Sequence, residues 1–482
     1  MTNTTKNNAF RRTQLNRRKF LTACAAGLMI PQLSALAGSV EKTDDGFFIL
    51  KAKKSETKFF GDNGPTTQVW SYNNTNPGPI IKVKQGEKVK VRLVNELDQA
   101  TSIHWHGIRI DNKMDGVSGL TQDAVKPGES FDYEFTAPDA GTYWYHTHNR
   151  SWEQLARGLY GLLIVEEPDK SDVREINLVI DDWRLDNAGK IDEKSMGEMH
   201  DWAHGGRLGN VLTLNGKQKP KIKLNAGERV RLRIVNVANS RIMELKLADH
   251  DPWIIAKDGH PITPRKLKKD DLILGPAQRI DLMLDATHKP GTQSPIHFVD
   301  QQQKYEIASF EYSQDQTVAP ITSPPKALAI TMPHANFKPL TAKIVPLVMI
   351  GGAMGSMEKA IVGGKTLDWK QLVKAKRVWA FNGIAGDLDK PLVKVNRGET
   401  VQIDITNDTA FPHAMHLHGT HFKVVARNNM SFNNGEWRDT ELVYPNEKVS
   451  FAFLADNPGK WLFHCHMIEH QAGGMVTWID VV

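Results

Sequence analysis

The sequence predicts an all-β protein of three β-sandwich domains, and three observations favour this fold class. A chain of 482 residues is long enough for about three domains of roughly 150 residues each. Short segments with apolar residues at every second position recur along it, with Gly, Pro, Asn or Asp nearby. One of these segments occurs three times. Many short strands at close spacing are typical of β-sandwiches or barrels.

The repeated segment combines a Gly-Glu turn, apolar residues at alternate positions and a final Asn. Its copies are Val83–Asn95, Leu224–Asn236 and Val395–Asn407. Alternation of period two marks a strand with one buried face, so each copy predicts a turn followed by a strand. We expect further strands in the segments Ser130–Phe135, Ile176–Ile180, Arg279–Leu284 and Val449–Leu454.

We place the three domains at residues 38–168, 169–325 and 326–482. The second boundary falls in a proline-rich stretch that is typical of a linker. Its prolines are Pro320, Pro324, Pro325, Pro333 and Pro339.

The first 37 residues are typical of an export signal. A basic stretch precedes the apolar segment Phe20–Ile30, and Ala35-Leu36-Ala37 is a small-residue cleavage site. Asn16–Leu21, with Arg17 and Arg18, resembles the motif read by the twin-arginine export machinery. A disordered basic tail or a nuclear signal would explain neither the apolar stretch nor the cleavage triplet. We therefore expect a periplasmic protein whose signal peptide is removed near Ala37.

The charge of the chain is concentrated in this signal. The whole chain has a formal net charge of +6. Its first 37 residues hold six basic and no acidic side chains, so their removal leaves 6 − 6 = 0. The basic residues are Lys6, Arg11, Arg12, Arg17, Arg18 and Lys19. A neutral mature chain gives no electrostatic reason to bind nucleic acid or anionic membranes. No apolar run approaches the roughly 20 residues of a membrane-spanning helix, so we expect no membrane insertion.

Pairs of histidines recur at fixed distances from the repeat. His104 follows Val89 by 104 − 89 = 15 residues, and His416 follows Val401 by 416 − 401 = 15 residues. Both begin a His-x-His-Gly sequence. A second pair begins 19 residues after a proline in each outer domain, at His146 after Pro127 and at His464 after Pro445. In the middle domain the same offset as for His104 falls on Leu245-Lys246-Leu247.

These pairs predict a metal cluster between the outer domains. Residues i and i+2 of a strand point to the same side, so each pair presents two imidazoles together. The eight ligands are His104, His106, His146, His148, His416, His418, His464 and His466. Imidazole suits copper, zinc, iron and nickel alike, so these residues alone do not identify the metal.

The surroundings of Cys465 point to copper. Cleavage near Ala37 removes Cys24 and leaves Cys465 as the single cysteine. His470 and Met475 follow it with four residues between successive ligands, and His413 lies three residues before His416. One thiolate, two imidazoles and a weak axial thioether form the ligand set of blue-copper electron-transfer sites.

Four motifs in this order resemble the copper signatures of bacterial three-domain multicopper oxidases, laccase-like or copper-efflux-oxidase-like. They are His104-Trp-His-Gly107, Trp144-Tyr-His-Thr-His148, His413-Ala-Met-His-Leu-His-Gly419 and His464-Cys-His-Met-Ile-Glu-His-Gln-Ala-Gly-Gly-Met475. The resemblance implies cupredoxin-like Greek-key β-sandwich domains, four copper ions and oxidation of small reductants coupled to four-electron reduction of O2 to water.

Carried over residue by residue, the resemblance implies one ligand set for each copper. The type 1 copper takes His413, Cys465, His470 and Met475, and the type 2 copper takes His104 and His416. One type 3 copper takes His106, His146 and His466, and the other takes His148, His418 and His464.

The resemblance also implies that Asp115 relays protons, although a plain turn explains the Asp115-Gly116 pair equally well. Related copper-efflux oxidases often carry a carboxylate just after the position of His470, where this chain has Gln471. A second relay residue is therefore not identified.

Two other functions and several donors stay open at this point. A copper-free periplasmic scaffold would lose the ligands, whereas this chain keeps all twelve. A periplasmic copper-binding or resistance protein without significant turnover is the other alternative. The electron donor is a phenol, Cu(I), Fe(II) or Mn(II). For Cu(I), two methionine groups stand out: Met196 and Met199 beside His200 and His204, and Met349, Met354 and Met357, which the nearby glycines predict to lie in an exposed loop.

Overall fold

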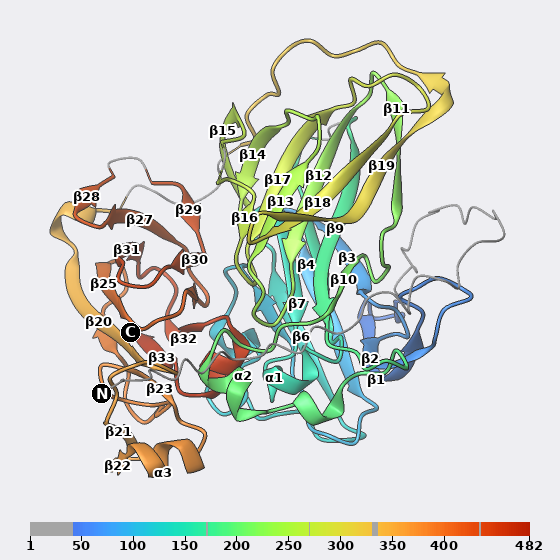
Figure 1. The fold of residues 1–482 in the computed structure, drawn as a ribbon. Coiled ribbons are helices and arrows are strands. Elements are labelled where there is room, and N and C mark those ends of the chain that lie inside the picture. Colours follow the sequence, from blue (N-terminus) through green and yellow to red (C-terminus); the bar gives the residue numbers. More distant parts are fainter. Residues whose placement is uncertain (1–41, 170–171, 269, 330–335, 433–434) are drawn as a thin grey trace, which may run out of the picture. The chain divides into compact units, whose positions relative to one another are not determined.

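The computed structural model describes residues 42–482 apart from 170–171, 269, 330–335 and 433–434. The predicted signal peptide and His334 lie outside the described residues. Strands are the main regular secondary structure of the described chain, and they form three successive pairs of sheets, which Figure 1 colours blue to cyan, green to yellow and orange to red.

The first pair of sheets has the strand orders β2-β1-β4-β6 and β3-β8-β7-β5. The strands are β1 (Phe48–Thr57), β2 (Thr67–Tyr72), β3 (Gly78–Lys84), β4 (Lys88–Asn95), β5 (His104–His106), β6 (Ser130–Thr136), β7 (Gly141–His146) and β8 (Tyr160–Glu166).

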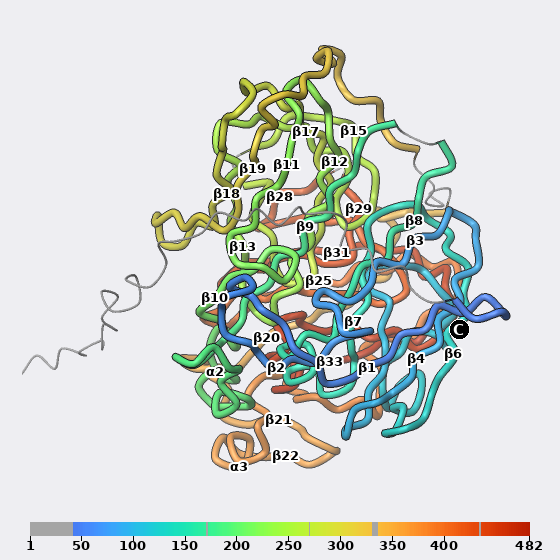
Figure 2. Tube along the Cα trace, turned by 90° about the vertical axis from the view of Figure 1, so that its right-hand side faces the viewer, coloured from blue at the N-terminus to red at the C-terminus, as the bar shows by residue number. Residues whose placement is uncertain are grey.

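The second pair has the orders β10-β9-β12-β17-β14-β15 and β11-β19-β18-β13-β16. Figure 2 follows these strands in the view turned by 90°. They are β9 (Arg174–Trp183), β10 (Val211–Leu214), β11 (Lys221–Ala226), β12 (Arg229–Asn236), β13 (Met243–Leu247), β14 (Trp253–Lys257), β15 (His260–Lys266), β16 (Ile273–Leu274), β17 (Arg279–Asp285), β18 (Gln293–Asp300) and β19 (Gln303–Thr317).

The third pair has the orders β23-β20-β25-β31-β27-β28, with β29 beside β27, and β24-β33-β32-β26-β30. A separate hairpin joins β21 to β22. The strands are β20 (Lys343–Gly351), β21 (Lys359–Val362), β22 (Lys365–Asp368), β23 (Trp379–Phe381), β24 (Val393–Val395), β25 (Thr400–Asp408), β26 (His413–Leu417), β27 (Phe422–Arg427), β28 (Met430–Ser431), β29 (Trp437–Arg438), β30 (Thr440–Val443), β31 (Lys448–Leu454), β32 (Gly459–Cys465) and β33 (Val476–Val481).

Helices within the described residues are short. The α-helices are α1 (Ser151–Gln154), α2 (Met199–Ala203), α3 (Trp369–Lys374) and α4 (Ile468–Ala472), and the 3-10 turns are η2 (Asn112–Met114), η3 (Glu193–Ser195) and η4 (Pro339–Thr341). None of the helices that the structure describes has the length and apolar character to cross a membrane.

Each pair of sheets encloses a hydrophobic core of its own, which confirms the predicted all-β class of three sandwiches. Leu93 and Tyr145 meet in the first core, Leu232 and Phe298 in the second, and Ile403 and Phe463 in the third. The two residues of each pair come from opposite sheets. The described residues 318–329, which include Pro320, Pro324 and Pro325, form neither helix nor strand. The domain boundary placed in this stretch remains a prediction.

The sequence repeat occupies the same place in each sandwich. The strands β4, β12 and β25 each pair in parallel with the first strand of their own sheet and antiparallel with a later strand. The Asn that closes each copy also repeats its hydrogen bonds. Asn95 accepts from the amide two residues later and donates to two carbonyls, and Asn236 and Asn407 do the same. The equal spacing in the three copies therefore reflects a buried Asn that anchors the loop after each strand.

Candidate metal centres

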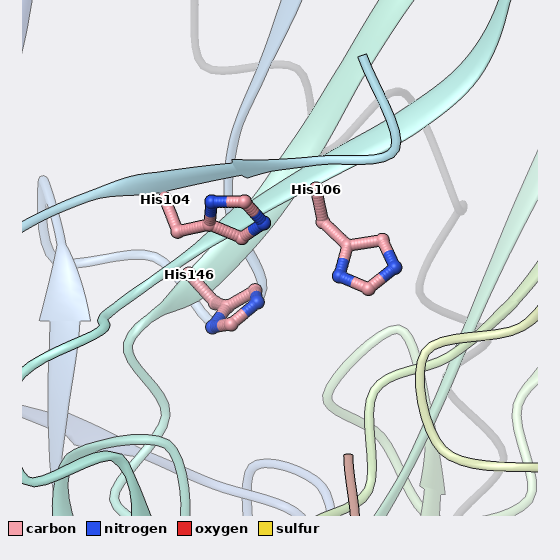
Figure 3. A group of neighbouring side chains, drawn as sticks. All are labelled: His104, His106 and His146. Carbon is pink, nitrogen blue, oxygen red and sulfur yellow. The ribbon is translucent and has the colours of Figure 1, made fainter. Parts of the chain in front are cut away.

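Matching strand pairs position the histidines of the outer sandwiches. β5 pairs with β7 so that His104 lies opposite His146, and β26 pairs with β32 so that His416 lies opposite His464. The second histidine of each His-x-His therefore follows on the same side of its strand. Figure 3 shows His104 and His106 pointing to one side of β5, with His146 beneath them.

The imidazoles of the two sandwiches meet face to face. The ring centroids of His104 and His418 are 3.8 Å apart, and those of His106 and His416 are 3.7 Å apart. His148 and His464 add an edge contact at 5.4 Å. All eight predicted histidines of the cluster are buried. The structure thus brings the four predicted histidine pairs together.

One nitrogen in four of the eight rings is held by a main-chain carbonyl. The Nδ1 atoms of His104, His146 and His464 donate to the carbonyls of Asp115, Thr147 and Cys465, each at 2.9 Å. His416 Nδ1 donates to the carbonyl of Asp439 at 2.8 Å. Such bonds fix the ring orientation and the tautomer, which is how proteins prepare imidazole for a metal.

The remaining nitrogens fit a metal cluster. Buried nitrogens without a hydrogen-bond partner are His104 Nε2, His106 Nδ1, His148 Nε2, His416 Nε2 and His466 Nδ1. The Nε2 atoms of His418 and His464 face each other at 3.1 Å. Unsatisfied buried nitrogens are costly unless something binds them. The donor set is therefore one that metal ions complete.

Burial also keeps these rings neutral. It lowers the pKa of His106, His416 and His466 well below the ordinary value, and the neighbouring imidazoles lower it further. For His464 the pKa falls to about 3, again mainly through burial. Neutral imidazole is the form that binds metal.

Three-residue groups with ligand atoms within 4.8 Å of one another match part of the predicted sets. One group is His148, His418 and His464, the set predicted for one type 3 copper. The other groups of the cluster link His104 with His106 and His146, His104 with His416 and His418, and His106 with His416 and Asp439. His466 approaches His146 through the Nε2 atoms at 3.4 Å. The distribution of single histidines over the three ions stays a prediction.

The predicted type 1 ligands form a second group in the third sandwich. Cys465 Sγ lies 3.6 Å from His413 Nδ1 and 3.8 Å from His470 Nδ1, and the two nitrogens are 3.0 Å apart. Met475 is fully buried in the same core, and its carbonyl accepts from the amide of Cys465 at 3.1 Å. Burial raises the pKa of the Cys465 thiol to about 12. A bound cation would therefore have to displace the proton.

The far nitrogens of both type 1 histidines are also held. His413 Nε2 contacts Thr409 Oγ1 at 2.8 Å. His470 Nε2 donates to the carbonyl of His204 at 2.6 Å. His204 follows α2, so the second sandwich reaches the type 1 group through this helix.

Asp115 lies inside the histidine cluster. Its carboxylate is 3.0 Å from His418 Nδ1 and 3.2 Å from His104 Nδ1, and only 1% of its surface is exposed. It therefore contacts candidate ligands of both outer sandwiches, which is compatible with the predicted relay role.

The methionine prediction needs correction. Met349 lies on β20 and is fully buried, and Met357 is 6% exposed. Both pack in hydrophobic clusters, so the glycines beside them do not make an exposed loop of the whole segment. Met354 alone is exposed, at 82%.

Sequence reasoning missed several residues that contact candidate ligands. Asp439 and Thr440 contact His106, and Arg279 binds Asp439. Glu469, next to His470, accepts from Asn239 and Ser240 of the second sandwich. A carboxylate beside a ligand and an arginine at the start of a predicted strand were visible signals, but neither indicates its partner.

The side chains of the remaining described histidines belong to neither group, although the main-chain carbonyl of His204 contacts His470. Leu245 and Leu247 of β13 lie in the second core where the outer sandwiches carry imidazoles. His250 contacts Tyr312, and His421 donates to the carbonyl of Gly107. His200 and His204 stack at 4.2 Å beside α2.

Comparisons with known proteins agree with this architecture. Three family models, each described as multicopper oxidase, match residues 53–170, 174–312 and 364–482. The multicopper oxidase MmcO of Mycobacterium tuberculosis is 29% identical over 99% of both chains. A multicopper oxidase structure from Pseudomonas parafulva is 32% identical, with a TM-score of 0.76, covering 90% of this chain and 100% of that one. A structure from Campylobacter jejuni, titled a metallo-oxidase, is 26% identical over 92% of both chains, with a TM-score of 0.76.

A three-sandwich fold with buried histidine clusters and these relatives defines a copper-dependent oxidase, and the chain belongs to the multicopper oxidase family. More narrowly, it is a three-domain multicopper oxidase of the bacterial type, with cupredoxin-like domains. It is an oxidoreductase that uses copper, reducing substrates and O2. A copper-binding protein without turnover is therefore not favoured.

Proposed function

We propose that the protein binds four copper ions and couples one-electron oxidation of small reductants at a type 1 site to reduction of O2 to water at a trinuclear cluster. The ligands are those assigned from the sequence: His413, Cys465, His470 and Met475 for type 1, His104 and His416 for type 2, and His106, His146, His148, His418, His464 and His466 for type 3. Copper bound there would supply one-electron redox steps and bind oxygen.

The position of Cys465 carries this proposal. Its Sγ faces His413 and His470, while its neighbours His464 and His466 face histidines of the first sandwich. The three residues His464–His466 at the end of β32 therefore join the type 1 group to the histidine cluster by covalent bonds. Electrons would have a through-bond route from donor to oxygen.

Other residues of the chain would serve this reaction by orienting the ligand histidines and by keeping them buried away from water. Main-chain carbonyls orient His104, His146, His416 and His464, and burial keeps the rings neutral. Reduction of one O2 to two waters takes four electrons and four protons, and we infer that Asp115, whose carboxylate lies 3.0 Å from His418 Nδ1, relays protons. A cavity of about 420 Å³ with His148, Arg150 and Gln471 in its wall supports access for O2 and water.

The test is substitution of the thiol. Cys465→Ser should abolish the blue absorption and donor oxidation, because a hydroxyl is a much poorer copper ligand than a thiolate. Copper in the histidine cluster should largely remain. Absorption spectra, copper content per chain and oxygen uptake measure these effects. Met467→Leu, a buried neighbour that is not a ligand, is the matched control. A blue and active Cys465→Ser protein would overturn the proposal.

We infer that the electron donors are small reductants and that the protein accepts many of them, phenols included. We also infer that Cu(I) is a physiological donor. Ala353 donates to the carbonyl of Ala203 at 2.6 Å, so the loop that carries exposed Met354 adjoins α2. α2 in turn contacts His470 through His204. A soft thioether near the type 1 group suits Cu(I), and one relative's title names a metallo-oxidase.

The sequence alone supports domain boundaries at residues 38–168, 169–325 and 326–482, which we keep as a proposal. We also propose export, again from the sequence alone. The twin-arginine machinery would carry the folded protein to the periplasm and the signal peptide would end near Ala37. Arg17→Lys combined with Arg18→Lys should leave the precursor in the cytoplasm, since the paired arginines are the signal that is read. Fractionation with immunoblotting measures this, and Arg11→Lys with Arg12→Lys is the control. Normal periplasmic activity of the Arg17/Arg18 variant would refute the route.

A further inference from the structure

We propose that Arg279 of the second sandwich is a positioning residue for the trinuclear site, where it acts through Asp439 on His106 and His416. The inference rests on the proposed role of these histidines as ligands. It gives the middle domain, which supplies no ligand, a direct part in shaping the oxygen-reducing centre.

Arg279 forms a bidentate ion pair with Asp439 through the two terminal nitrogens of its guanidinium. Nη1 donates to Oδ1 at 2.8 Å and Nη2 donates to Oδ2 at 2.7 Å. Both side chains are fully buried. Arg279 Nε also donates to the carbonyl of Thr142 on β7 at 3.2 Å. The side chain therefore links β17 to β7 of the first sandwich and to the residue between β29 and β30 of the third, and the two parallel bonds leave Asp439 one orientation.

Asp439 and the next residue hold the candidate ligands. Asp439 Oδ1 lies 3.1 Å from His106 Nε2, and its main-chain carbonyl accepts from His416 Nδ1 at 2.8 Å. Thr440 Oγ1 lies 3.2 Å from His106 Nε2 and 3.1 Å from His416 Nδ1. Gln278, beside Arg279, donates to the carbonyl of Thr440 at 2.9 Å.

These contacts decide which ring nitrogens face the centre. His106 Nε2 and His416 Nδ1 are occupied by Asp439 and Thr440. The nitrogens left without a partner are His106 Nδ1 and His416 Nε2. If the Asp439 side chain turned away, His106 could rotate and present the wrong nitrogen, and His416 would lose the carboxylate that lies 3.6 Å from its Nδ1.

Asp115 has a matching place in the first sandwich. Its carbonyl accepts from His104 Nδ1 and its carboxylate contacts His418 across the interface. Asp439 holds His416 by its carbonyl and contacts His106 across the interface. In the described part of the chain, the ion pairs of Asp115 involve histidines only. Asp115 and Asp439 thus occupy pseudo-symmetric positions, and Asp439 differs in that its carboxylate is fixed by an ion pair with Arg279.

The Arg279–Asp439 ion pair packs against the end of β5, the strand that carries His104 and His106. Gly107 follows His106 with a φ of +84°. A Cβ there would overlap the guanidinium of Arg279 and the carboxylate of Asp439. Glycine thus lets the main chain beside His106 lie directly on the ion pair.

The experiment must separate positioning from stability alone. Asp281 lies two residues along β17, is buried and pairs with Arg231 and Arg233, and none of its hydrogen bonds reaches a candidate ligand. Asp281→Asn is therefore the matched control. The test variants are Arg279→Gln, Arg279→Lys and Asp439→Asn, each made in the full chain and loaded with copper.

Arg279→Gln and Asp439→Asn should lose copper from the trinuclear site or show a shifted type 2 electron paramagnetic resonance spectrum, while the blue type 1 absorption persists. Arg279→Lys should recover part of the signal, since it keeps the charge but not the fork. Asp281→Asn should show normal copper spectra whatever its melting temperature. Unchanged type 2 spectra and copper content in Asp439→Asn would overturn the inference.

If the unmodified, copper-loaded protein shows neither the blue absorption nor the type 2 electron paramagnetic resonance signal, the proposed function fails, whatever the role of Arg279. If Arg279→Gln does not fold, Asp439→Asn and Thr440→Val decide the matter, since both leave Arg279 in place. Thr440→Val removes only the hydroxyl between the two rings, and a normal type 2 spectrum in both variants would overturn the inference.

Discussion

At the scale of single residues, the cluster depends on how the second nitrogen of each imidazole is used. His146 and His464 each donate Nδ1 to the carbonyl of the following residue. His104 and His416 each donate Nδ1 to the carbonyl of an aspartate. The same local geometry thus occurs in both outer sandwiches, which is why the equal offsets in the sequence lead to equivalent side-chain positions.

Asp115 supports a prediction at this scale. Asp115→Asn should slow oxygen reduction by about 10²-fold or more, because an amide cannot take up and release the proton that general acid catalysis needs. Reduction of the type 1 site by donor without oxygen should keep its rate. Stopped-flow absorbance separates the two steps. Asp111→Asn, in the same loop but exposed, is the control. Equal oxygen reduction in Asp115→Asn and the native protein would exclude the relay.

At the scale of elements, short segments outside the sandwiches reach the type 1 group. α2 contacts His470 through the carbonyl of His204, and α4 carries His470 itself. The loop after β20 is bonded to α2 by Ala353. We propose that a donor approaches the type 1 ligands along these segments.

The element-scale prediction concerns Met354. Met354→Leu should lower Cu(I) oxidation several-fold and leave phenol oxidation unchanged, because it removes an exposed thioether without altering the core. Met357→Leu, buried in the same segment, is the control and should change neither activity. Oxygen uptake with each donor measures both. If the two activities fall together, or if neither falls, Met354 is not a Cu(I) contact.

At the scale of the whole molecule, the middle sandwich supports both centres. Gln278 and Arg279 hold Thr440 and Asp439 beside the histidine cluster. Asn239 and Ser240 bind Glu469 beside His470. The centres therefore depend on the assembly of three domains, and a change in domain docking should disturb copper as well as stability.

Removal of copper should make the protein sensitive to acid. Burial lowers the pKa of His146, His418 and His464, among others, below the value of about 6.5 in unfolded chains. Below that pH the unfolded chain binds more protons than the folded one, so folding stability falls as pH falls. Each such histidine contributes up to about 1.4 kcal/mol per pH unit.

Thermal unfolding between about pH 7.5 and about pH 5 tests this expectation. The melting temperature of copper-stripped protein should fall steeply below about pH 6.5, and that of copper-loaded protein should fall less, since bound metal keeps imidazole unprotonated. Parallel curves for the two forms would contradict the expectation.

Much of the fold and of the candidate ligand set could be predicted from the sequence, because the signals involved are local. Period-two alternation marks β4, β12 and β25, and equal offsets lead from Val89 to His104 and from Val401 to His416. Strand geometry then places both members of each His-x-His on one side. The fold class, the family and the grouping of imidazoles thus follow from the sequence.

Only the tertiary structure decided which residues support these ligands. Arg279 and Asp439 are 160 residues apart, and His204 and His470 are 266 apart. No periodicity or spacing connects them, since the contacts arise where separately folded sandwiches meet. The same holds for Met349 and Met357, which glycine-rich neighbours predicted to be exposed but which pack in hydrophobic clusters. Sequence patterns report the neighbours along one strand, whereas burial and ion pairing depend on surfaces that distant segments bring together.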